Sequence, residues 1–457
     1  METPIADFVN TYRESGTVRL HMPGHKGRGP LGCEALDITE ITGADALYEA
    51  EGIIARSEKN AAALFGTAAT LYSTEGSSQC IRAMLYLALL RAETPEGRRP
   101  VVVAARNAHK VFLLTAALLD FDVVWLWQAE GELSLCRCAV SPQQLEETLR
   151  GLPFPPAAVY VTSPDYLGGE LDIRALAETA HAFGVPLLVD DAHGAYQKFL
   201  PGGRHPMEQG ADLCCDSAHK TLPVLTGGAY LHVSRTAPAC FAENGKRALS
   251  LFGSTSPSYL ILQSLDLANR RLAEDYPERL RQSAEGLTAL KRRLEKNGWR
   301  VAESDPLKLT LLTKESGWLG SELSRRLYQG GIEWEYADPD ALVLMVTPEN
   351  TEEDLQQLEK VLGRNLRSVP IPRPDLRMAP PEQVCTPRQA MRRQAECIPA
   401  EQAEGRVLAD PSVGCPPAVP VVVSGERITA EAVEIFRYYG IHVLHVLPEA
   451  VPHSGKK

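Results

Sequence analysis

Short apolar runs, separated by stretches with helical spacing, dominate the first half of the chain. Four such runs lie at residues 101–103, 123–126, 158–161 and 187–189. Runs of this length are typical of strands that are buried on both faces of a parallel sheet. A helical pattern, with apolar residues at i, i+3, i+4, i+7 and i+8, is formed by Ile81, Met84, Leu85, Ala88 and Leu89. The alternation predicts an α/β fold whose mostly parallel sheet has helices on both faces.

The pattern divides the chain into five parts. We expect an N-terminal arm rich in Gly and Pro (1–55), a large domain that carries the sheet (56–265), a smaller α/β domain (266–369), a stiff proline-rich linker (370–381) and a small C-terminal domain (382–457). A long amphipathic stretch at 259–297 leads into the smaller domain. Strands are expected there at 307–312 and 341–346, and a helix with an acidic first turn at 351–362.

Composition excludes several classes of protein. Hydrophobic residues make up 44% of the 457 positions and charged residues 23%, as in ordinary globular proteins. The net charge of −11 argues against nonspecific binding of nucleic acid. No apolar run approaches the roughly 20 residues of a membrane span, and the N-terminus does not resemble a signal peptide. We therefore expect a cytoplasmic protein that neither crosses a membrane nor binds nucleic acid.

The ten cysteines do not form a metal-binding pattern. The close pairs are Cys214–Cys215 and Cys136–Cys138, and neither has a second pair at zinc-like spacing. We predict free thiols, mostly buried, and no metal site.

The most informative chemical pattern is an aspartate and a lysine 30 positions apart. Asp190 ends one of the apolar runs, and Lys220 lies in a Ser-Ala-His-Lys-Thr segment. An enzyme that uses pyridoxal 5'-phosphate (PLP) needs a lysine to hold the aldehyde as a Schiff base and a carboxylate to keep the pyridine nitrogen protonated. Either residue by itself has an ordinary structural explanation, such as a surface lysine or a helix-capping aspartate.

A possible phosphate site and a histidine add to this pattern. Gly76, Ser77 and Ser78 precede the helical run at 81–89, where free N–H groups, the helix dipole and two hydroxyls favour an anion. An ordinary helix cap would have the same residues. His109 follows the run at 101–103, and the ends of such strands carry the ligand sites of open α/β sheets.

The chain is similar to the bacterial ornithine/lysine/arginine decarboxylase family, which has the fold-type-I PLP-enzyme architecture, in its shorter form without an N-terminal wing domain. Segments that resemble the family's motifs occur in family order, at residues 21–27, 37–41, 43–47, 106–110, 162–168, 190–194, 217–221, 254–259, 416–417 and 423–428. The resemblance thus covers nearly the whole chain.

The resemblance implies a role for each matching residue. It implies that Lys220 forms the Schiff base with the cofactor and that Asp190 binds the ring nitrogen. His109 and Ala192 would contact the two faces of the ring, and His193 would lie beside the ring. The phosphate ligands would be Ser77, Ser78, Ser217 and His219, with Thr255 and Ser256 reaching across a dimer interface. Lys220 or His219 would return a proton to Cα.

The implied activity is decarboxylation of arginine, lysine or ornithine to an amine and CO2, as in polyamine biosynthesis, by a homodimer or a larger even oligomer. A basic substrate needs an acidic partner for its far end. Candidates near the substrate are Glu75, Glu40, Asp45, His21 and His25, and Glu49 and Glu51 are further possible acids. The two histidines are equally well explained as residues that stabilise the arm.

Departures from the family pattern leave alternatives open. Glu75 stands where Asn is usual, Cys415 where Tyr is common and Ala418 where Gly is common. An aminotransferase or an eliminating lyase on the same fold would use the same cofactor. A catalytically silent scaffold is disfavoured by the complete set of site residues.

Overall fold

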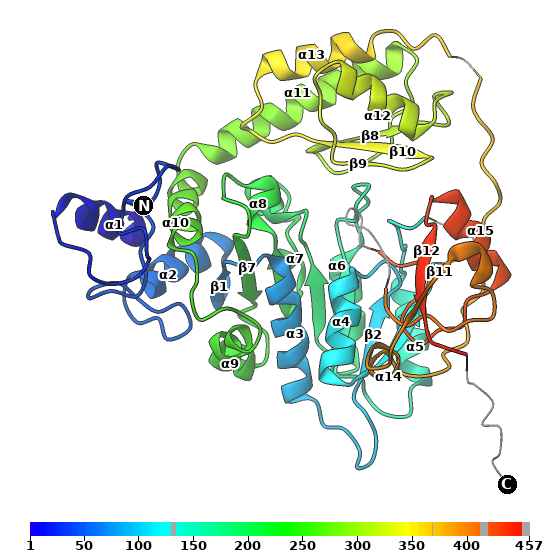
Figure 1. Ribbon diagram of the computed structural model, residues 1–457, viewed down its shortest axis with the longest axis horizontal. Helices are drawn as coiled ribbons and strands as arrows, with labels where there is room; N and C mark the ends of the chain where they lie inside the picture. Colours follow the sequence, from blue (N-terminus) through cyan, green and yellow to red (C-terminus); the bar gives the residue numbers. More distant parts are fainter. Residues whose placement is uncertain (129–133, 368, 412–418, 450–457) are drawn as a thin grey trace.

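The computed structural model describes residues 1–128, 134–367, 369–411 and 419–449. Cys415, the Pro416–Pro417 pair and Ala418 lie outside the described residues. Figure 1 shows a large sheet domain, a smaller domain above it and a C-terminal domain beside it.

The large sheet has seven strands, in the order β1-β7-β6-β5-β4-β2-β3. They are β1 (Ala69–Ser73), β2 (Val101–Ala105), β3 (Asp122–Leu126), β4 (Ala158–Thr162), β5 (Leu187–Asp190), β6 (Leu213–Asp216) and β7 (Ala229–Val233). β7 is antiparallel to both β1 and β6, and the other pairs are parallel. The predicted mostly parallel sheet is confirmed, and the four apolar runs correspond to β2, β3, β4 and β5.

Alternate residues of the central strands build two separate cores. Val102 and Ala104 face a core that includes α3 and α4, whereas Val103 and Ala105 face a core that includes α5 and α6. Residues one apart on a strand point to opposite faces, so a strand covered on both sides must be apolar throughout. The helices of this domain are α2 (Ile53–Phe65), α3 (Ser77–Arg91), α4 (Lys110–Leu119), α5 (Pro142–Gly151), α6 (Ile173–Ala182), η1 (Ala195–Phe199), α7 (Pro206–Gln209), α8 (Ala218–Thr221) and α9 (Ala239–Ser250).

The arm and the long amphipathic stretch lie together. Helix α1 (Pro4–Glu14) contacts α2 and α10 (Tyr259–Ala273). The stretch expected as one unit is two helices, α10 and α11 (Tyr276–Lys296), because the backbone at Glu274 leaves helical geometry, with φ −107° and ψ −91°. The domain boundary expected at residue 265 falls inside α10.

The smaller domain is an antiparallel sheet covered by helices. Its strands are β8 (Lys308–Leu312), β9 (Tyr336–Ala337) and β10 (Ala341–Met345), and its other helices are α12 (Gly320–Gln329) and α13 (Glu352–Leu362). Thr351 accepts from the Asp354 N–H in a capping box, as the acidic first turn predicts. Both predicted strands and the predicted helix are confirmed.

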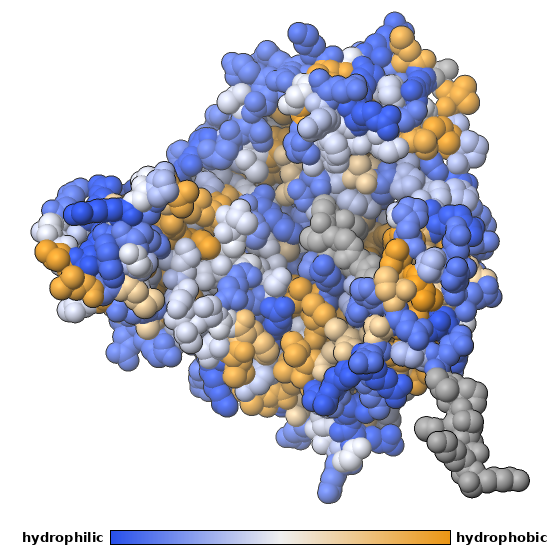
Figure 2. Space-filling view, in the orientation of Figure 1, coloured by the Kyte–Doolittle hydropathy of each residue, from blue (hydrophilic) through white to orange (hydrophobic). Residues whose placement is uncertain are grey.

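The C-terminal domain packs against the large domain. It comprises α14 (Pro387–Met391), β11 (Glu396–Pro399), η2 (Ala400–Gln402), α15 (Ala430–Tyr438) and β12 (Val443–Val446), and α14 contacts α4 (Figure 1). None of the helices in the described ranges combines the length and apolar character needed to cross a bilayer. The face in Figure 2 is largely hydrophilic, with apolar side chains gathered in a few patches, one of them around the lower part of α3.

Candidate functional site

Lys220 lies in the short helix α8, directly after strand β6. Its Nζ atom is 3.0 Å from Nε2 of His193 and 6.0 Å from the ring centre of Tyr166. The rings of Tyr166 and His193 meet edge to face at 4.7 Å. Burial, and then the charge of Lys220, lower the pKa of His193 well below its usual range. A neutral His193 therefore accepts a hydrogen bond from the lysine.

Asp190 ends β5, the strand next to β6, and its carboxylate is surrounded by donors. Tyr160 Oη donates to Oδ2 at 2.9 Å, and the Ala192 N–H donates to Oδ1 at 3.2 Å. Cys215 Sγ lies 3.6 Å from Oδ1. Hydrogen bonds from several donors stabilise an ionised carboxylate although it is buried.

The start of α3 and the start of α8 meet through two hydroxyls. Ser217 Oγ lies 2.6 Å from Ser77 Oγ, and Gly76 is the N-cap of α3 with a φ of +72° that suits glycine. Ser78 occupies the first turn of α3. The free N–H groups at a helix N-terminus, together with these hydroxyls, are able to bind a phosphate.

His109 caps α4 by accepting a hydrogen bond from the Val111 N–H at Nδ1. Burial lowers the pKa of His109 to about 4, and Lys220 adds to the effect, while Asp190 opposes it. The side chain is therefore neutral at physiological pH, with its proton on Nε2. A flat, uncharged ring suits stacking on an aromatic ligand.

His219 is tied to the neighbouring turn. Its Nδ1 donates to the Gly228 carbonyl at 3.0 Å, so Nε2 of the neutral ring is the acceptor. Burial lowers the pKa of His219, and Lys220 contributes in the same direction. The neutral form is thus favoured, and its Nε2 carries no proton to donate. The structure therefore suits His219 better as a binding residue than as a proton donor.

The arm residues that the sequence proposed near the substrate are engaged within the arm. Asp45 accepts from the N–H groups of residues 51, 52, 54 and 55 at the start of α2. His21 bonds to Tyr12, His25 to Asp37 and Glu40 to Thr39. These contacts agree with the arm-stabilising explanation, and none of them links the arm to Lys220.

Glu75 contacts the segment that follows α9. Its carboxylate accepts from the Ser254 N–H, next to the exposed Thr255 and Ser256. It neither caps α3, where Gly76 is the N-cap, nor contacts Ser77 in the described structure. The carboxylate therefore orients the segment expected to reach a partner subunit.

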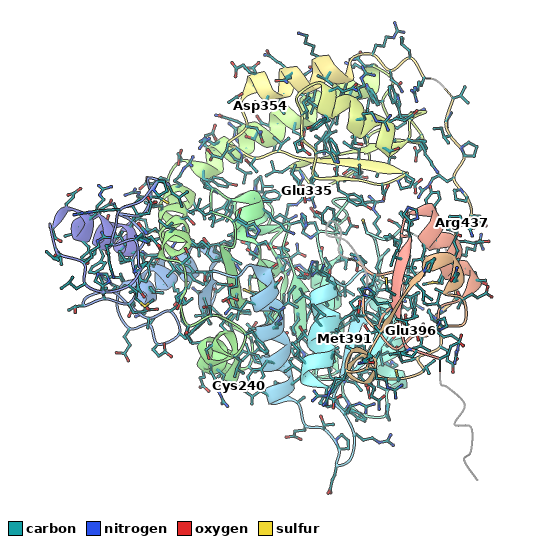
Figure 3. The ribbon with its side chains drawn as sticks, viewed as in Figure 1. Cys240, Glu335, Asp354, Met391, Glu396 and Arg437 are labelled. Atoms are coloured by element: carbon teal, nitrogen blue, oxygen red, sulfur yellow. The ribbon has the colours of Figure 1, made fainter. Side chains whose placement is uncertain are left out.

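Three further residues belong to the site but were not singled out from the sequence. Tyr160 supports Asp190, and Tyr166 lies against His193 as described above. Tyr166 Oη also donates to the carboxylate of Glu335, which comes from the smaller domain. Figure 3 shows Glu335 below the small sheet, on the side that faces α8. Tyr166 lies within a motif that the sequence already marked, whereas Glu335 carries no local signal.

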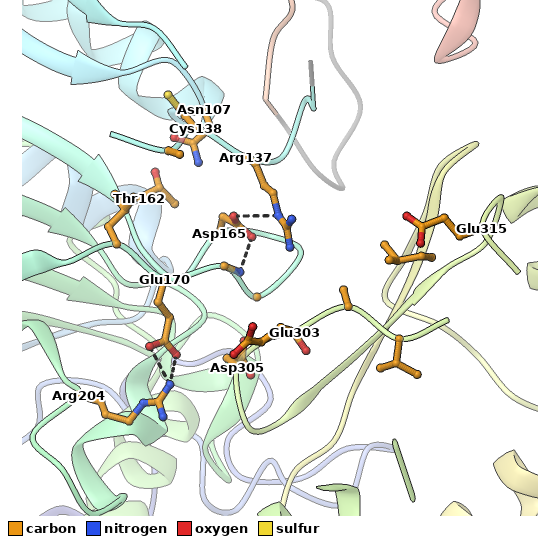
Figure 4. A pocket seen from close by; sticks show the side chains of 18 of the residues that line it. Asn107, Arg137, Cys138, Thr162, Asp165, Glu170, Arg204, Glu303, Asp305 and Glu315 are labelled. Carbon is orange, nitrogen blue, oxygen red and sulfur yellow. Dashed lines mark hydrogen bonds and ion pairs between the residues drawn. The ribbon is translucent and has the colours of Figure 1, made fainter. Parts of the chain in front are cut away.

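A cavity of about 820 Å³ lies where the large and smaller domains meet (Figure 4). Thr162 and Asn107 are among its lining residues, and Thr162 pairs with Asp190 across β4 and β5. Arginines line it too, but each has a carboxylate partner: Arg137 with Asp165, Arg204 with Glu170 and Arg373 with Asp340. The cavity is therefore lined by both positive and negative side chains.

The C-terminal domain reaches the site through one buried ion pair. Arg106 directly follows β2, and both of its terminal nitrogens donate to Glu426, at 3.0 and 2.7 Å. The guanidinium also lies over the rings of Trp125 and Trp127 at 4.8 and 4.5 Å. This bidentate contact fixes the backbone three residues before His109.

The described cysteines are all free thiols, as predicted, and five of the nine are buried. Burial raises the pKa of both Cys214 and Cys215, with nearby aspartates adding to the effect. These thiols are therefore protonated and unreactive.

Comparison with known proteins agrees with the fold and the motifs. Residues 3–303 match the model of the Orn/Lys/Arg decarboxylase major domain, and residues 373–450 match that of the Orn/Lys/Arg decarboxylase C-terminal domain. An arginine decarboxylase of Bacillus subtilis (strain 168) is 29% identical, over 94% of this chain and 92% of the relative.

Solved structures share the fold. Lysine decarboxylase A from Pseudomonas aeruginosa superposes with a TM-score of 0.79 at 18% identity, covering 97% of this chain and 80% of that one. A structure of SPT with PLP has a TM-score of 0.53 at 17% identity, covering 68% and 75%. The matches to both domains, which together span most of the sequence, mean that the chain belongs to the Orn/Lys/Arg decarboxylase family and is a decarboxylase.

Proposed function

We propose that the chain is a PLP-dependent decarboxylase that converts arginine, lysine or ornithine to the corresponding amine and CO2. The observation that carries the proposal is the convergence of a lysine amine, a buried carboxylate and a pair of hydroxyls at the ends of β5 and β6 and the start of α3. These are Lys220, Asp190, Ser77 and Ser217. They correspond in type and order to the groups that hold PLP.

The residues fit this cofactor in three respects. The Asp190 carboxylate accepts from three donors, an arrangement that suits a partner for a protonated ring nitrogen. The N-terminus of α3 and the Ser77–Ser217 pair suit a phosphate. His193 Nδ1 is buried and has no hydrogen-bond partner in the described part of the chain, so a bound molecule would satisfy it. Bound PLP supplies an electron-accepting ring that stabilises the electron pair left on Cα when CO2 departs.

The protein residues prepare this chemistry. Lys220 would bind the aldehyde covalently through Nζ, and neutral His193 holds that atom in place. His109 would lie flat against the ring, while the phosphate site fixes its rotation. Together these residues would orient the bound substrate and so select which bond at Cα breaks.

Glu335 supplies the acidic partner that a basic substrate needs. It is the carboxylate tied to Tyr166, and Tyr166 lies against both Lys220 and His193. A charge-assisted bond from Glu335 to the far ammonium or guanidinium group would select basic amino acids. Among the acids that the sequence proposed, Asp45 is already saturated by backbone N–H groups.

The proposal includes a homodimer or a larger even oligomer. Thr255 and Ser256 are exposed in the single chain, as expected for residues that contact a second subunit's phosphate. Apolar side chains on the arm are exposed as well, with Val18 at 77%, Leu20 at 89% and Leu31 at 82%. Light scattering on purified protein tests this part, and an active monomer would contradict it.

The direct test is a spectrum and a product assay. PLP is added to the purified protein, and arginine, lysine and ornithine are then offered separately while CO2 and amine are measured. We expect an absorbance band near the visible edge and CO2 from at least one of the three. A band without CO2 would indicate transamination or elimination instead, and no band would contradict the cofactor assignment.

A further inference from the structure

Four polar side chains are completely buried on the sheet face opposite to the carboxylate of Asp190. They are Asp191, His205, Asp216 and His232, and the side chain of each has no accessible surface. Asp191 and Asp216 continue β5 and β6 beyond the pair formed by Asp190 and Cys215. The two carboxyl groups therefore end up next to each other beneath the site.

Asp216 is the acceptor at the centre of this cluster. Its Oδ2 lies 3.2 Å from Nε2 of His205 and 3.0 Å from Nε2 of His232. Its Oδ1 lies 3.5 Å from Cys214 Sγ. Three donors for one carboxylate indicate that Asp216 is ionised.

The hydrogen-bond network assigns the protons of the histidines. Nδ1 of His205 accepts from the Met207 N–H at 3.3 Å, so a neutral His205 carries its proton on Nε2 and donates it to Asp216. Nδ1 of His232 lies 2.8 Å from Thr70 Oγ1, which is able to donate to it. Both imidazoles are thus satisfied as neutral donors.

Asp191 has no such donors. Neither of its carboxyl oxygens has a hydrogen-bond partner in the described part of the chain. Nε2 of His205 lies 3.4 Å from Oδ2, but its proton points to Asp216. An ionised carboxylate buried without partners is strongly unfavourable. A proton on Asp191 removes the charge and provides a donor for the neighbouring Asp216.

We propose that Asp191 and Asp216 share one proton, and that this pair, held by His205 and His232, positions the ends of β5 and β6 that carry Asp190 and Lys220. Asp191 directly follows Asp190. Asp216 directly precedes Ser217 and lies four positions before Lys220. The shared proton is argued from the placement of both carboxylates against Nε2 of His205, at 3.4 Å for Asp191 and 3.2 Å for Asp216. The positioning role rests on the proposed function.

The titration behaviour of the pair agrees with this arrangement. Burial raises the pKa of Asp191 well above its usual range, and the charge of Asp216 raises it further. Burial opposes ionisation of Asp216 as well, but His232 and His205 outweigh it and lower the pKa of that carboxyl. Other titratable groups interact electrostatically with the pair. The charge of Asp216 acts on Cys214 and Cys215 from β6, Tyr230 from β7 and Cys80 from α3, and the charges of Asp190 and Glu170 raise the pKa of Asp191.

A metal ion is the competing explanation for the cluster. One ligand-type atom from each of Asp191, His205, Cys214 and Asp216 lies within 4.8 Å of the others. However, His205 uses Nδ1 as an acceptor, so the nitrogen that faces the carboxylates carries a proton and has no lone pair for a metal. The geometry therefore favours a proton.

The decisive variant is Asp191→Asn, because an amide has the shape of a protonated carboxyl and donates to Asp216 in the same way. We expect its thermal midpoint at pH 8 to equal or exceed that of the wild type. Wild-type Asp191 holds a proton in the folded state that the unfolded chain releases above about pH 4, so wild-type stability falls as the pH rises. The advantage of the variant should accordingly grow from pH 5 to pH 8.

Asp212→Asn is the matched control. Asp212 is also buried next to a strand end, but its carboxylate accepts from the Leu187 N–H and bonds to Nε2 of His181. This variant should lose stability at pH 8. An equal loss in Asp191→Asn, or stoichiometric metal in purified wild-type protein by elemental analysis, would overturn the shared proton.

The positioning role is tested by cofactor binding. Asp216→Asn should raise the dissociation constant of PLP at least tenfold, as measured by fluorescence titration, while Asp191→Asn stays within about threefold of the wild type. If Asp216→Asn does not fold, His232→Gln, which removes one ring donor, should weaken PLP binding in the same direction. Unchanged affinity in the folded variant would refute positioning. Wild-type protein that binds no PLP would refute the proposed function instead, and the stability comparison would still decide the shared proton.

Discussion

Nζ of Lys220 lies 3.0 Å from Nε2 of His193, a histidine whose pKa is lowered by burial and by Lys220 itself. The two side chains come from segments that follow adjacent parallel strands, β5 and β6. This contact holds the amine at one defined place, in a segment that follows the strand next to that of Asp190. The proposed cofactor would be anchored at Lys220, Asp190 and the Ser77–Ser217 pair.

Replacing Lys220 by Ala should abolish both the visible absorbance with PLP and the decarboxylation, because the covalent attachment is lost. An exposed lysine provides the control, and Lys59→Ala should leave both unchanged. Absorbance retained in Lys220→Ala would mean that another amine binds the aldehyde.

His109 should titrate far below an ordinary histidine. Burial lowers its pKa to about 4, against about 6.5 in an unfolded chain. The unfolded state therefore binds more protons between these values, and the folded protein loses stability as the pH falls from about 6.5 to 4.

His109→Gln should flatten the pH profile of the unfolding free energy across that interval, since the amide does not titrate. The exposed His442 is the control, and His442→Gln should keep the wild-type profile. Denaturant unfolding at pH 4.5, 5.5 and 7 measures the difference. An unchanged slope in His109→Gln would show that this histidine is not held neutral.

Glu335→Gln should weaken binding of basic amino acids and of their product amines by about 10- to 100-fold, which corresponds to the loss of one charge-assisted hydrogen bond. Calorimetric titration with agmatine, cadaverine and putrescine measures binding apart from turnover. Glu333→Gln, two positions away and exposed, is the control. Equal affinity in the two variants would remove Glu335 from the substrate site.

Glu426→Gln should destabilise the protein by about 3–5 kcal/mol, because the buried Arg106 guanidinium loses its bidentate partner. Glu382→Gln breaks an exposed pair with Arg427 and should cost less than about 1 kcal/mol. Urea unfolding distinguishes the two. Similar small losses would mean that Trp125 and Trp127 are sufficient to hold Arg106.

The sequence predicted four of the seven strands of the large domain, β2 to β5, because these strands are almost uniformly apolar. A strand covered on both faces must be apolar at every position, so β2 to β5 appear as unbroken runs. The amphipathic stretch at 259–297 was less informative, because its periodicity continues through Glu274, where the backbone turns between α10 and α11. Periodicity reports a buried face but not a change of direction.

The candidate cofactor residues could be proposed from the sequence for a related reason. Asp190 and Lys220 follow neighbouring strands, and the carboxyl ends of parallel strands meet at one edge of a sheet. Acidic residues that lie near the arm motifs were proposed for the substrate, but Asp45 serves the backbone of α2 instead. The partner of a carboxylate depends on which donors lie near it in the folded chain, and the order of residues in the sequence does not show this.

The sequence by itself determined the fold class and the family, since these depend on local patterns and on the order of strands. Only the tertiary structure brought Glu335 to Tyr166 across 169 positions and Glu426 to Arg106 across 320. It also placed Asp191 beside Asp216. Such contacts depend on how domains and strands pack, and the free energy that selects them comes from burial and pairing in three dimensions.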